Sequence, residues 1–390
     1  MITLNDESNK GKIAIVVVGY NRQKSIARLL DSLLQAHYSN ANVPLYISID
    51  ASEDEKLYQY VRDFNWPFGE KYVNIQSTRL GLKNHIFQCG NLTKQFKAIV
   101  LLEDDLYVSP YFYEYVERTV EVYGTDDRIA EISLYKNEIN GYASLPFRNI
   151  QDGNDVFLMQ DVSTWGQCWT ETMWESFVEW RDSHSEDDIQ RVDMPERIKK
   201  WERAWSKYYL AYVIATGRHI LFPNISLTTN FSDAGEHGGN QNSAVQVSLL
   251  QGGKQYVLKN IGELTSYDIY DNNESIYEWL GLKKEDVCLD LYGNHNDFSK
   301  RYLLSTRLFS FKVVDSFALY MRPIELNIKF KIKGEGIFLY DTSVGDKRDN
   351  GFSRFFGSYM LGVFDARLLR EQVNGYYKKI IKSKIKKIFK

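Results

Sequence analysis

The sequence is poor in the features that mark several common classes of protein. It has only three cysteines in 390 residues (Cys89, Cys168 and Cys288), none with C-x-x-C spacing, which excludes a disulfide framework and argues against a structural zinc site. No stretch approaches the roughly 18 uninterrupted apolar residues of a transmembrane helix. The polar segment MITLNDESNKGK lacks the apolar core of a signal peptide. We therefore expect a cytoplasmic chain.

The sequence also lacks a strong excess of charge of either sign. Lysine and arginine (48) nearly balance aspartate and glutamate (51), which leaves a net charge of −3 and argues against a nucleic-acid partner. Apolar residues make up 44% of the chain and aromatic residues 14%, which is enough for a buried core. At roughly 150 residues per domain, this length predicts two or three domains.

The first 135 residues alternate between strand-like and helix-like patterns. Residues 12–19 form a continuous apolar, β-branched run, and residues 25–36 carry apolar side chains at helical spacing. The alternation continues with strands expected at 44–50, 72–76, 98–102 and 129–134, and helices at 53–64, 82–96 and 111–123. This order predicts an α/β fold with a mainly parallel sheet built from right-handed crossovers. Neither G-x-G-x-x-G nor G-x-x-x-x-G-K-[ST] occurs, so neither a dinucleotide fingerprint nor a P-loop is predicted.

The segment LLEDDLY carries the strongest chemical signal in the chain. It places Glu103, Asp104 and Asp105 at the end of an apolar strand, where three carboxylates repel one another and are costly to bury unpaired. A divalent cation neutralises such a cluster, and oxygen ligands suit Mg2+ or Mn2+. A solvated acidic loop is the alternative. Ligands of parallel α/β sheets bind beyond the carboxyl ends of the strands, which favours a metal–nucleotide site.

Four segments, in this order and spacing, resemble the GT-A glycosyltransferases: VVVGYNR, ISIDAS, RLGLKNH and LLEDD. The first elements are similar to family-2 glycosyltransferases, and the E-D-D variant resembles the family-13 N-acetylglucosaminyltransferases. The later segments TWGQCWTETMW, WSKYY, GRHILFPNISLT and DAGEHG are similar to the acceptor half of bacterial family-2 members. The resemblance covers about residues 11–240. It implies a GT-A, Rossmann-like fold with a mixed, mainly parallel sheet, followed by a smaller C-terminal domain.

The resemblance implies a nucleotide-sugar site at the ends of the first four strands. The residues that it assigns there are Gly19, Tyr20, Asn21, Arg22, Asp50, Arg79, Gly81, Leu82, Glu103 and Asp104. Asp105 and His237 would bind a Mn2+ or Mg2+ ion that bridges the diphosphate. A cation there would stabilise the charge that develops on the leaving group. Simpler roles stay open: Asp50 as the N-cap of the following helix, Arg79 in a surface ion pair, and His237 as a solvated loop residue.

The general base is the weakest part of the resemblance. Inverting enzymes need a carboxylate to take the proton of the acceptor hydroxyl. The family-13 pattern has acids just after a tryptophan, whereas Trp205 is followed here by serine and lysine. The candidates are Glu202, three residues earlier and on the same face if a helix continues through both, and Asp161. We prefer Glu202, and the departure keeps a catalytically silent module as an alternative.

Most of the tryptophans are expected in the core, but some are candidates for acceptor binding. Trp165 with Gly166 is suited to pack under a sugar ring, because the apolar face of a sugar stacks on indole. Trp205 is the third residue that we assign to the acceptor. Core packing is the simpler role for each of these tryptophans.

The expected domains are 1–245, with a nucleotide half at about 11–135 and an acceptor half at about 136–245, then 246–375 and a basic tail at 376–390. The middle domain, α/β or mixed, contains no chemical motif. The tail has seven lysines between positions 378 and 390 and isoleucines at helical spacing, which is typical of an amphipathic element at an anionic membrane surface. A solvated basic tail is the alternative.

We therefore expect an inverting, metal-dependent glycosyltransferase, moving a hexose or N-acetylhexosamine from a nucleotide-diphosphate donor, with a UDP-sugar favoured. The acceptor would be a glycan or lipid-linked glycan in bacterial surface polysaccharide synthesis, at the inner face of the membrane. The alternative is a catalytically silent GT-A module that binds glycan or scaffolds a synthase. A sugar-nucleotide pyrophosphorylase is disfavoured because the glycine-rich loop after the first strand is missing. The sequence leaves oligomerisation open.

Overall fold

The computed structural model describes residues 9–39, 42–202, 204–233, 243–295, 297–347, 351–353 and 356–362, with isolated positions between 367 and 381. The chain forms two compact units. One consists of Met1–Tyr142 and Phe147–Ser275, and the other of Ala143–Pro146 and Ile276–Lys390. Cys89, Cys168 and Cys288 are buried and unpaired with one another. Within the described residues, no helix has both the length and the apolar character needed to span a bilayer.

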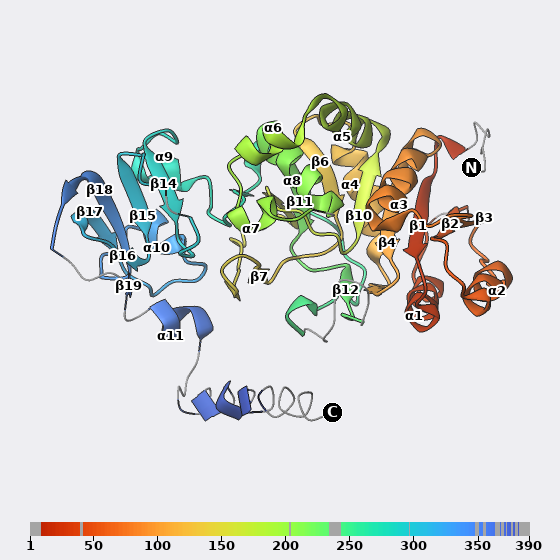
Figure 1. Cartoon of the computed structure of the whole chain (residues 1–390). Helices are drawn as coiled ribbons and strands as arrows, with labels where there is room; N and C mark the ends of the chain where they lie inside the picture. The colour runs from red at the N-terminus through yellow and green to blue at the C-terminus, as the bar shows by residue number, and fades with distance from the viewer. Residues whose placement is uncertain are drawn as a thin grey trace. The chain divides into compact units, whose positions relative to one another are not determined.

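The first unit is built on a nine-stranded sheet with the order β13-β9-β11-β6-β10-β4-β1-β2-β3 (Figure 1). Parallel pairs join β1 to β2 and β4, and β2 to β3, whereas β10 runs antiparallel to both β4 and β6. This sheet and a separate C-terminal sheet confirm the predicted fold class. The strands are β1 (Ile13–Gly19), β2 (Leu45–Ile49), β3 (Lys71–Ile75), β4 (Ala98–Glu103), β6 (Ile129–Ser133), β9 (Val156–Met159), β10 (Gln167–Thr170), β11 (His219–Pro223) and β13 (Ser266–Tyr267).

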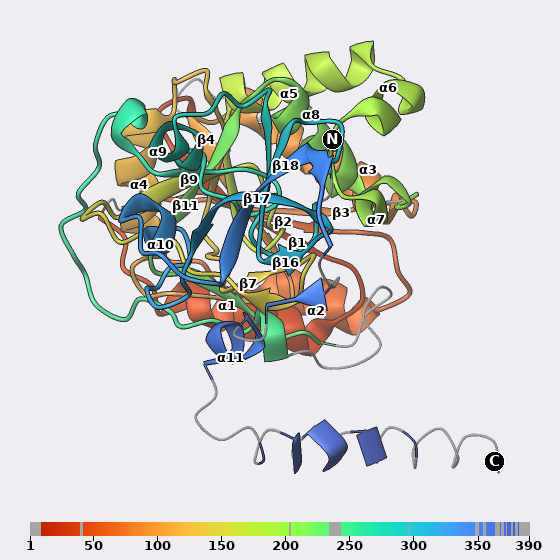
Figure 2. The same ribbon diagram turned by 90° about the vertical axis from the view of Figure 1, so that its left-hand side faces the viewer.

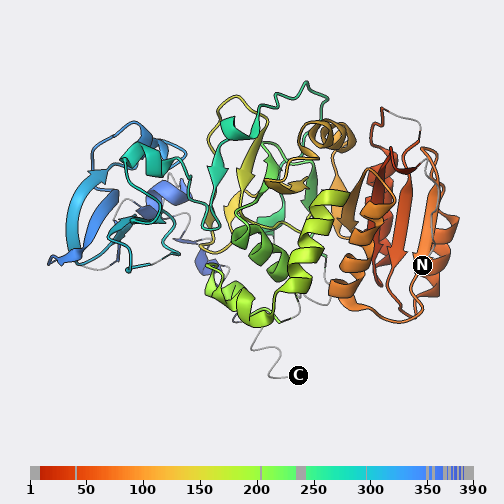
Figure 3. The same ribbon diagram turned by 90° about the horizontal axis from the view of Figure 1, so that it is seen from above.

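Helices cover both faces of this sheet, and Figure 3 shows α4 (gold) on one side and α5 and α8 (yellow-green to green) on the other. Helix α1 forms because Ile26, Leu29, Leu30 and Leu33 recur at helical spacing, and all four are buried. The helices are α1 (Gln23–Leu34), α2 (Glu55–Asp63), α3 (Gly81–Gly90), α4 (Phe112–Tyr123), α5 (Glu171–Ser183), α6 (Glu186–Arg191), α7 (Glu196–Lys199) and α8 (Trp205–Ala215). The alternation expected through residue 134 is therefore present.

The helix expected over residues 82–96 is shorter, because α3 ends at Gly90 and a 3-10 turn, η2 (Asn91–Lys94), follows. Gly90 lies against the indole of Trp174: a Cβ atom there would be 2.1 Å from Trp174 Cζ2. Trp174 in turn packs on Trp169, with 4.8 Å between ring centroids. The tryptophan-rich stretch thus builds the core between α3, α5 and the sheet.

The segment 246–275 belongs to the first unit, whereas the sequence placed it in the second domain. Strand β13 extends the large sheet by pairing in parallel with β9, and the N–H of Leu250 donates to the carbonyl of Ser226. These backbone hydrogen bonds are made across long sequence separations, so local composition does not reveal them.

The second unit contains a four-stranded sheet with the order β14-β15-β18-β17, whose strands are labelled in Figure 1; β17 and β18 can also be followed in Figure 2. Residues 324–340 contain a short helix followed by the start of a strand. The strands are β14 (Val287–Asp290), β15 (Tyr302–Ser305), β17 (Phe311–Phe317) and β18 (Ile337–Gly345), and the helices α9 (Ile276–Leu280), α10 (Leu326–Lys329) and α11 (Phe356–Leu361). The tail at 376–390 lies almost wholly outside the described residues.

Candidate functional site

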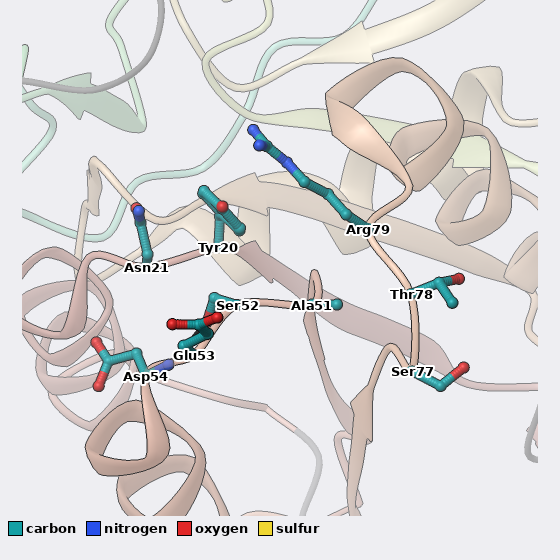
Figure 4. Close-up of a pocket in the computed structure, with 9 residues that line it drawn as sticks. All are labelled: Tyr20, Asn21, Ala51, Ser52, Glu53, Asp54, Ser77, Thr78 and Arg79. Carbon is teal, nitrogen blue, oxygen red and sulfur yellow. Dashed lines mark hydrogen bonds between the residues drawn. The ribbon is translucent and has the colours of Figure 1, made fainter.

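A pocket of about 720 Å³ lies at the carboxyl edge of β1, β2 and β3 (Figure 4). These strands are parallel, so the loops that follow them meet at one edge of the sheet. The strand order reverses between β1 and β4, and such a reversal is where open α/β sheets bind ligands. The pocket is lined by Tyr20, Asn21, Ala51, Ser52, Glu53, Asp54, Ser77, Thr78 and Arg79. Tyr20, Asn21 and Arg79 were expected at a nucleotide site.

Asp50 holds two of the pocket loops together. The side chain is 4% exposed; Oδ1 accepts from the N–H groups of Ala51 (2.9 Å) and Leu80 (2.8 Å), and Oδ2 from the N–H of Gly81 (2.9 Å). Asp50 therefore binds the N-terminus of α3, while α2 is capped by Asp54. An N-cap of the next helix along the chain, the simpler role considered above, is thus not its role. Gly81 has a φ of +72°, which favours glycine.

Tyr20 and Arg79 face each other across the pocket. The Arg79 guanidinium carbon lies 4.6 Å from the centroid of the Tyr20 ring. Figure 4 shows the Arg79 side chain extending from just before α3 toward Tyr20. Ser77 and Thr78 lie on the loop that leads to Arg79. A guanidinium over an aromatic ring is a favourable cation–π pair. Leu82, 38% exposed, lies just beyond on α3.

The acidic triplet lies at the end of β4, next to the end of β1. Arg22 spans the two strand ends: its Nε donates to Asp104 Oδ2 (3.2 Å), its Nη2 donates to Asp104 Oδ1, and its Nη1 lies 3.4 Å from Asp105 Oδ2. Burial raises the pKa of Asp104 to about 6, against the lowering effect of Arg22. Burial and the adjacent Asp105 and Asp104 raise the pKa of Glu103 to about 8.

The packing of Gly19 explains how β1 comes so close to this triplet. A Cβ atom on Gly19 would lie 3.2 Å from Ile26 Cδ1, 3.3 Å from Ile49 Cδ1 and 3.7 Å from Asp104 Cβ. A side chain at this position would crowd the ends of Ile26 and Ile49, so glycine suits the tight packing of the β1 end.

Two side chains beside the triplet were missed by sequence reasoning. Asn230 Nδ2 donates to Asp105 Oδ1 (3.1 Å), and the Asp233 carboxylate accepts from Ser25 Oγ (2.7 Å) and from Arg28. Strand β12 (Thr228–Asn230) reaches Asp105 by pairing with β5 (Leu106–Val108), which directly follows the triplet. The sequence did contain a signal for Asp233, because this acidic residue opens the segment DAGEHG. In that segment only His237 was assigned to the site, as a metal ligand. His237 itself lies outside the described residues.

The triplet can be tested as a metal site by the chemistry of its donors. Among the residues that the structure describes, no group of three or more His, Cys, Asp and Glu side chains is arranged to hold a metal ion. Asp105 has a side chain 16% exposed, and Mg2+ is commonly held by one or two carboxylates with substrate phosphates completing its shell. A metal ion here would have Asp105 as a protein ligand and would depend on a substrate diphosphate for the rest of its shell.

Neither candidate general base lines the pocket. The sequence predicted that Glu202 and Trp205 share one face of a helix. In the structure α8 begins at Trp205 and the exposed Glu202 lies before it, so the two residues do not share a helical face. Asp161 follows β9, four places from β4 in the sheet, and accepts from Asn137 Nδ2 (2.8 Å) and Tyr142 Oη (2.9 Å). Burial raises the pKa of Asp161 to about 6.

Of the acceptor candidates, Trp205 is a core residue. It is 2% exposed and packs edge-to-face on Trp169 with 6.0 Å between ring centroids, so the expectation that it contacts an acceptor is wrong for this structure. Trp165 is half-buried and packs edge-to-face on Tyr135, with centroids 4.7 Å apart. Gly166 has a φ of +105°, and a Cβ atom there would lie 2.9 Å from Thr228 Cγ2.

Neither a protein-family model nor a curated protein sequence matches this chain. Solved structures that are similar include S. aureus TarS 1–349 in complex with UDP-GlcNAc (14% identity, TM-score 0.36, over 58% of this chain and 60% of that chain). The mannosyltransferase PcManGT from Pyrobaculum calidifontis, with GDP-Man and Mn2+, is 10% identical (TM-score 0.35, 55% of each chain). GalNAc-T7 with UDP, GalNAc and Mn2+ is 15% identical (TM-score 0.37, 56% and 43%). The chain spans at most about three fifths of these proteins. The fold assignment therefore rests on the strand order above.

Proposed function

We propose that this chain is an inverting, metal-dependent glycosyltransferase that uses a nucleotide-diphosphate sugar, with a UDP-sugar favoured. The observation that carries the proposal is the juxtaposition at the strand reversal: a polar pocket at the ends of β1, β2 and β3, beside an acidic triplet at the end of β4. The acceptor would be a glycan or lipid-linked glycan of a bacterial surface polysaccharide.

The pocket suits the nucleoside part of the donor. Its volume of about 720 Å³ lies within the range of roughly 300–1,000 Å³ that is usual for small-molecule sites. Tyr20 and Arg79 offer an aromatic ring and a planar cation for contact with a base, and Asn21, Ser77 and Thr78 offer polar groups. Asp50 would act as a positioning residue, because its carboxylate already accepts three backbone hydrogen bonds.

The triplet suits the diphosphate part of the donor. A bound Mn2+ or Mg2+ ion would stabilise the negative charge on the departing nucleoside diphosphate. Asp105 would hold that ion, together with His237 as the sequence resemblance implies. Asp104, which pairs with Arg22 when no donor is bound, would orient the ribose or the donor sugar. Trp165 and Gly166, at the start of β10 next to β4, would contact the acceptor sugar.

For the general base we keep both candidates, Glu202 and Asp161. Glu202 is exposed and open to an acceptor, whereas the Asp161 carboxylate already accepts from Asn137 and Tyr142. The variants Asp161→Asn and Glu202→Gln distinguish the two candidates. The variant that lacks the general base should have a kcat lower by at least about a hundredfold and an unchanged affinity for the donor.

A catalytically silent module is the second candidate, and one observation favours it. Neither candidate base is among the pocket residues, and Lys207, which stands where the family-13 pattern has an acid, is 3% exposed and paired with Glu186. Release of UDP from a panel of UDP-hexoses and UDP-N-acetylhexosamines, with and without Mn2+, distinguishes the two. Metal-dependent release that is absent in Asp105→Ala supports the transferase. Binding of UDP without any release, transfer or hydrolysis supports the silent module.

A peripheral membrane role for the lysine-rich tail is a separate proposal. The full chain should co-sediment with phosphatidylserine-containing vesicles at low salt. A chain that lacks residues 376–390 should co-sediment less. Vesicles of neutral lipid are the control. Equal sedimentation of both chains with anionic vesicles would contradict a membrane role for the tail.

A further inference from the structure

Arg22 directs every nitrogen of its guanidinium group into the protein. Nε and Nη2 pair with the Asp104 carboxylate, and Nη1 lies 3.4 Å from Asp105 Oδ2 and 3.2 Å from the backbone carbonyl oxygen of Asp233. The side chain is 22% exposed, compared with 6% for Asp104 and 16% for Asp105. Arg22 therefore already provides the positive charge that three adjacent carboxylates require.

This arrangement places Arg22 in competition with a metal ion. A Mn2+ or Mg2+ ion binds a carboxylate oxygen at roughly 2.0–2.2 Å, and the Arg22 guanidinium lies 3.4 Å from Asp105 Oδ2. A dication on that oxygen would face a guanidinium only a few ångströms away, in a site that is largely shielded from water. The second oxygen, Oδ1, is engaged by the amide of Asn230. A metal ion on Asp105 and the Arg22 guanidinium beside it would therefore repel each other as the structure places them.

We propose that Arg22 is an internal counter-cation which blocks Asp105 to free metal ions and leaves it when a diphosphate arrives. The inference rests on the proposed function, because a nucleoside diphosphate provides the exchange. Guanidinium groups pair with phosphate oxygens in the same two-pronged way as with carboxylates, so the diphosphate offers Arg22 an equivalent partner. Tyr20 and Asn21, the two residues before Arg22, line the pocket, so Arg22 starts next to the ligand. Donor and metal would then bind cooperatively.

Titration of Mn2+ alone, followed by the electron paramagnetic resonance signal of free Mn2+, tests this with wild type, Arg22→Gln and Arg118→Gln. Arg118 is the control for loss of one positive charge, because it is an exposed residue of α4 that pairs with Glu121. We expect Arg22→Gln to bind free Mn2+ at least tenfold more tightly than wild type, and Arg118→Gln to bind like wild type. An Arg22→Gln affinity equal to or weaker than that of wild type would overturn the proposal.

A second measurement covers the case in which Arg22→Gln does not fold. Saturating UDP should increase the Mn2+ affinity of wild type at least tenfold. Equal Mn2+ affinity with and without bound UDP would contradict the exchange. The two failures are distinguishable: if UDP does not bind at all, the proposed function fails, while the titration of Mn2+ alone still tests Arg22 without any nucleotide.

Discussion

The Oδ2 atom of Asp50 accepts a hydrogen bond from the backbone N–H of Gly81 at 2.9 Å, which ties the end of β2 to the first turn of α3. The two residues are 31 positions apart, and a helix and a strand intervene. A carboxylate at the N-terminus of a helix satisfies N–H groups that have no partner within the helix. The wall of the pocket formed by residues 77–79 thus depends on one buried side chain.

Replacing Asp50 by alanine should therefore destabilise the first unit. The substitution leaves the N–H groups of Leu80 and Gly81 without their acceptor, and we expect a loss of roughly 2–4 kcal/mol in the free energy of unfolding. Urea denaturation gives the value. Asp54→Ala is the matched control, since it removes the ordinary N-cap of α2 and should cost about 1 kcal/mol. A smaller loss for Asp50→Ala than for Asp54→Ala would contradict this role.

Replacing Arg79 by alanine should weaken nucleotide binding. The guanidinium lies over Tyr20 at the pocket, and its removal takes away a planar cation beside the expected base. We expect a loss of about tenfold in UDP affinity by calorimetry, in line with one cation–π contact. Lys83→Ala is the control, because Lys83 lies one turn along α3 over Tyr208. An equal effect of the two substitutions would show that Arg79 acts only through overall charge.

Glu131 should make the stability of the first unit fall as pH rises. It is fully buried; Oε2 accepts from Gln167 Nε2 (2.7 Å) and Trp169 Nε1 (3.0 Å), and burial raises its pKa to about 8. The folded state therefore keeps a proton that the unfolded state loses near its ordinary pKa of 4.5. This group alone lowers the free energy of unfolding by about 1.4 kcal/mol per pH unit between those two values.

The variant Glu131→Gln isolates that effect. It removes the titrating group but can still accept from Trp169, so its melting temperature relative to wild type should rise steadily from pH 5 to pH 8. Taking the difference between the two proteins cancels the other titrating groups. Among the described residues, Glu131 Oε1 has no hydrogen-bond partner, so nothing there offsets the cost of burying its charged form. A difference that is constant with pH would contradict a protonated Glu131.

Patterns local in the sequence predicted the fold of the nucleotide half well. The continuous apolar run of β1 and the spacing of leucines in α1 depend only on which faces are covered, and this is encoded within about a dozen residues. The strand-end position of the acidic triplet follows from the same pattern. The assignment of Tyr20, Asn21 and Arg79 to one site came from the resemblance to GT-A glycosyltransferases, and all three line the pocket.

Contacts between distant segments were not predictable in the same way. The pairing of Arg22 with Asp104 joins residues 82 positions apart, and Asn230 reaches Asp105 across 125 positions. Composition near Trp205 gave no sign that α8 begins at that residue and that its indole lies in the core. Backbone pairing of β13 with β9, rather than any local change in composition, keeps residues 246–275 in the first unit.

The central claim is that the pocket and the acidic triplet together bind a nucleoside diphosphate through a metal ion at Asp105. Calorimetric titration with UDP and with GDP, each with and without Mn2+, tests it directly on wild type, Asp105→Asn and the exposed-site control Asp127→Asn. We predict Mn2+-dependent binding of one nucleotide to wild type and to the control, weakened at least tenfold in Asp105→Asn. Failure of both nucleotides to bind wild type in the presence of Mn2+ would contradict the account.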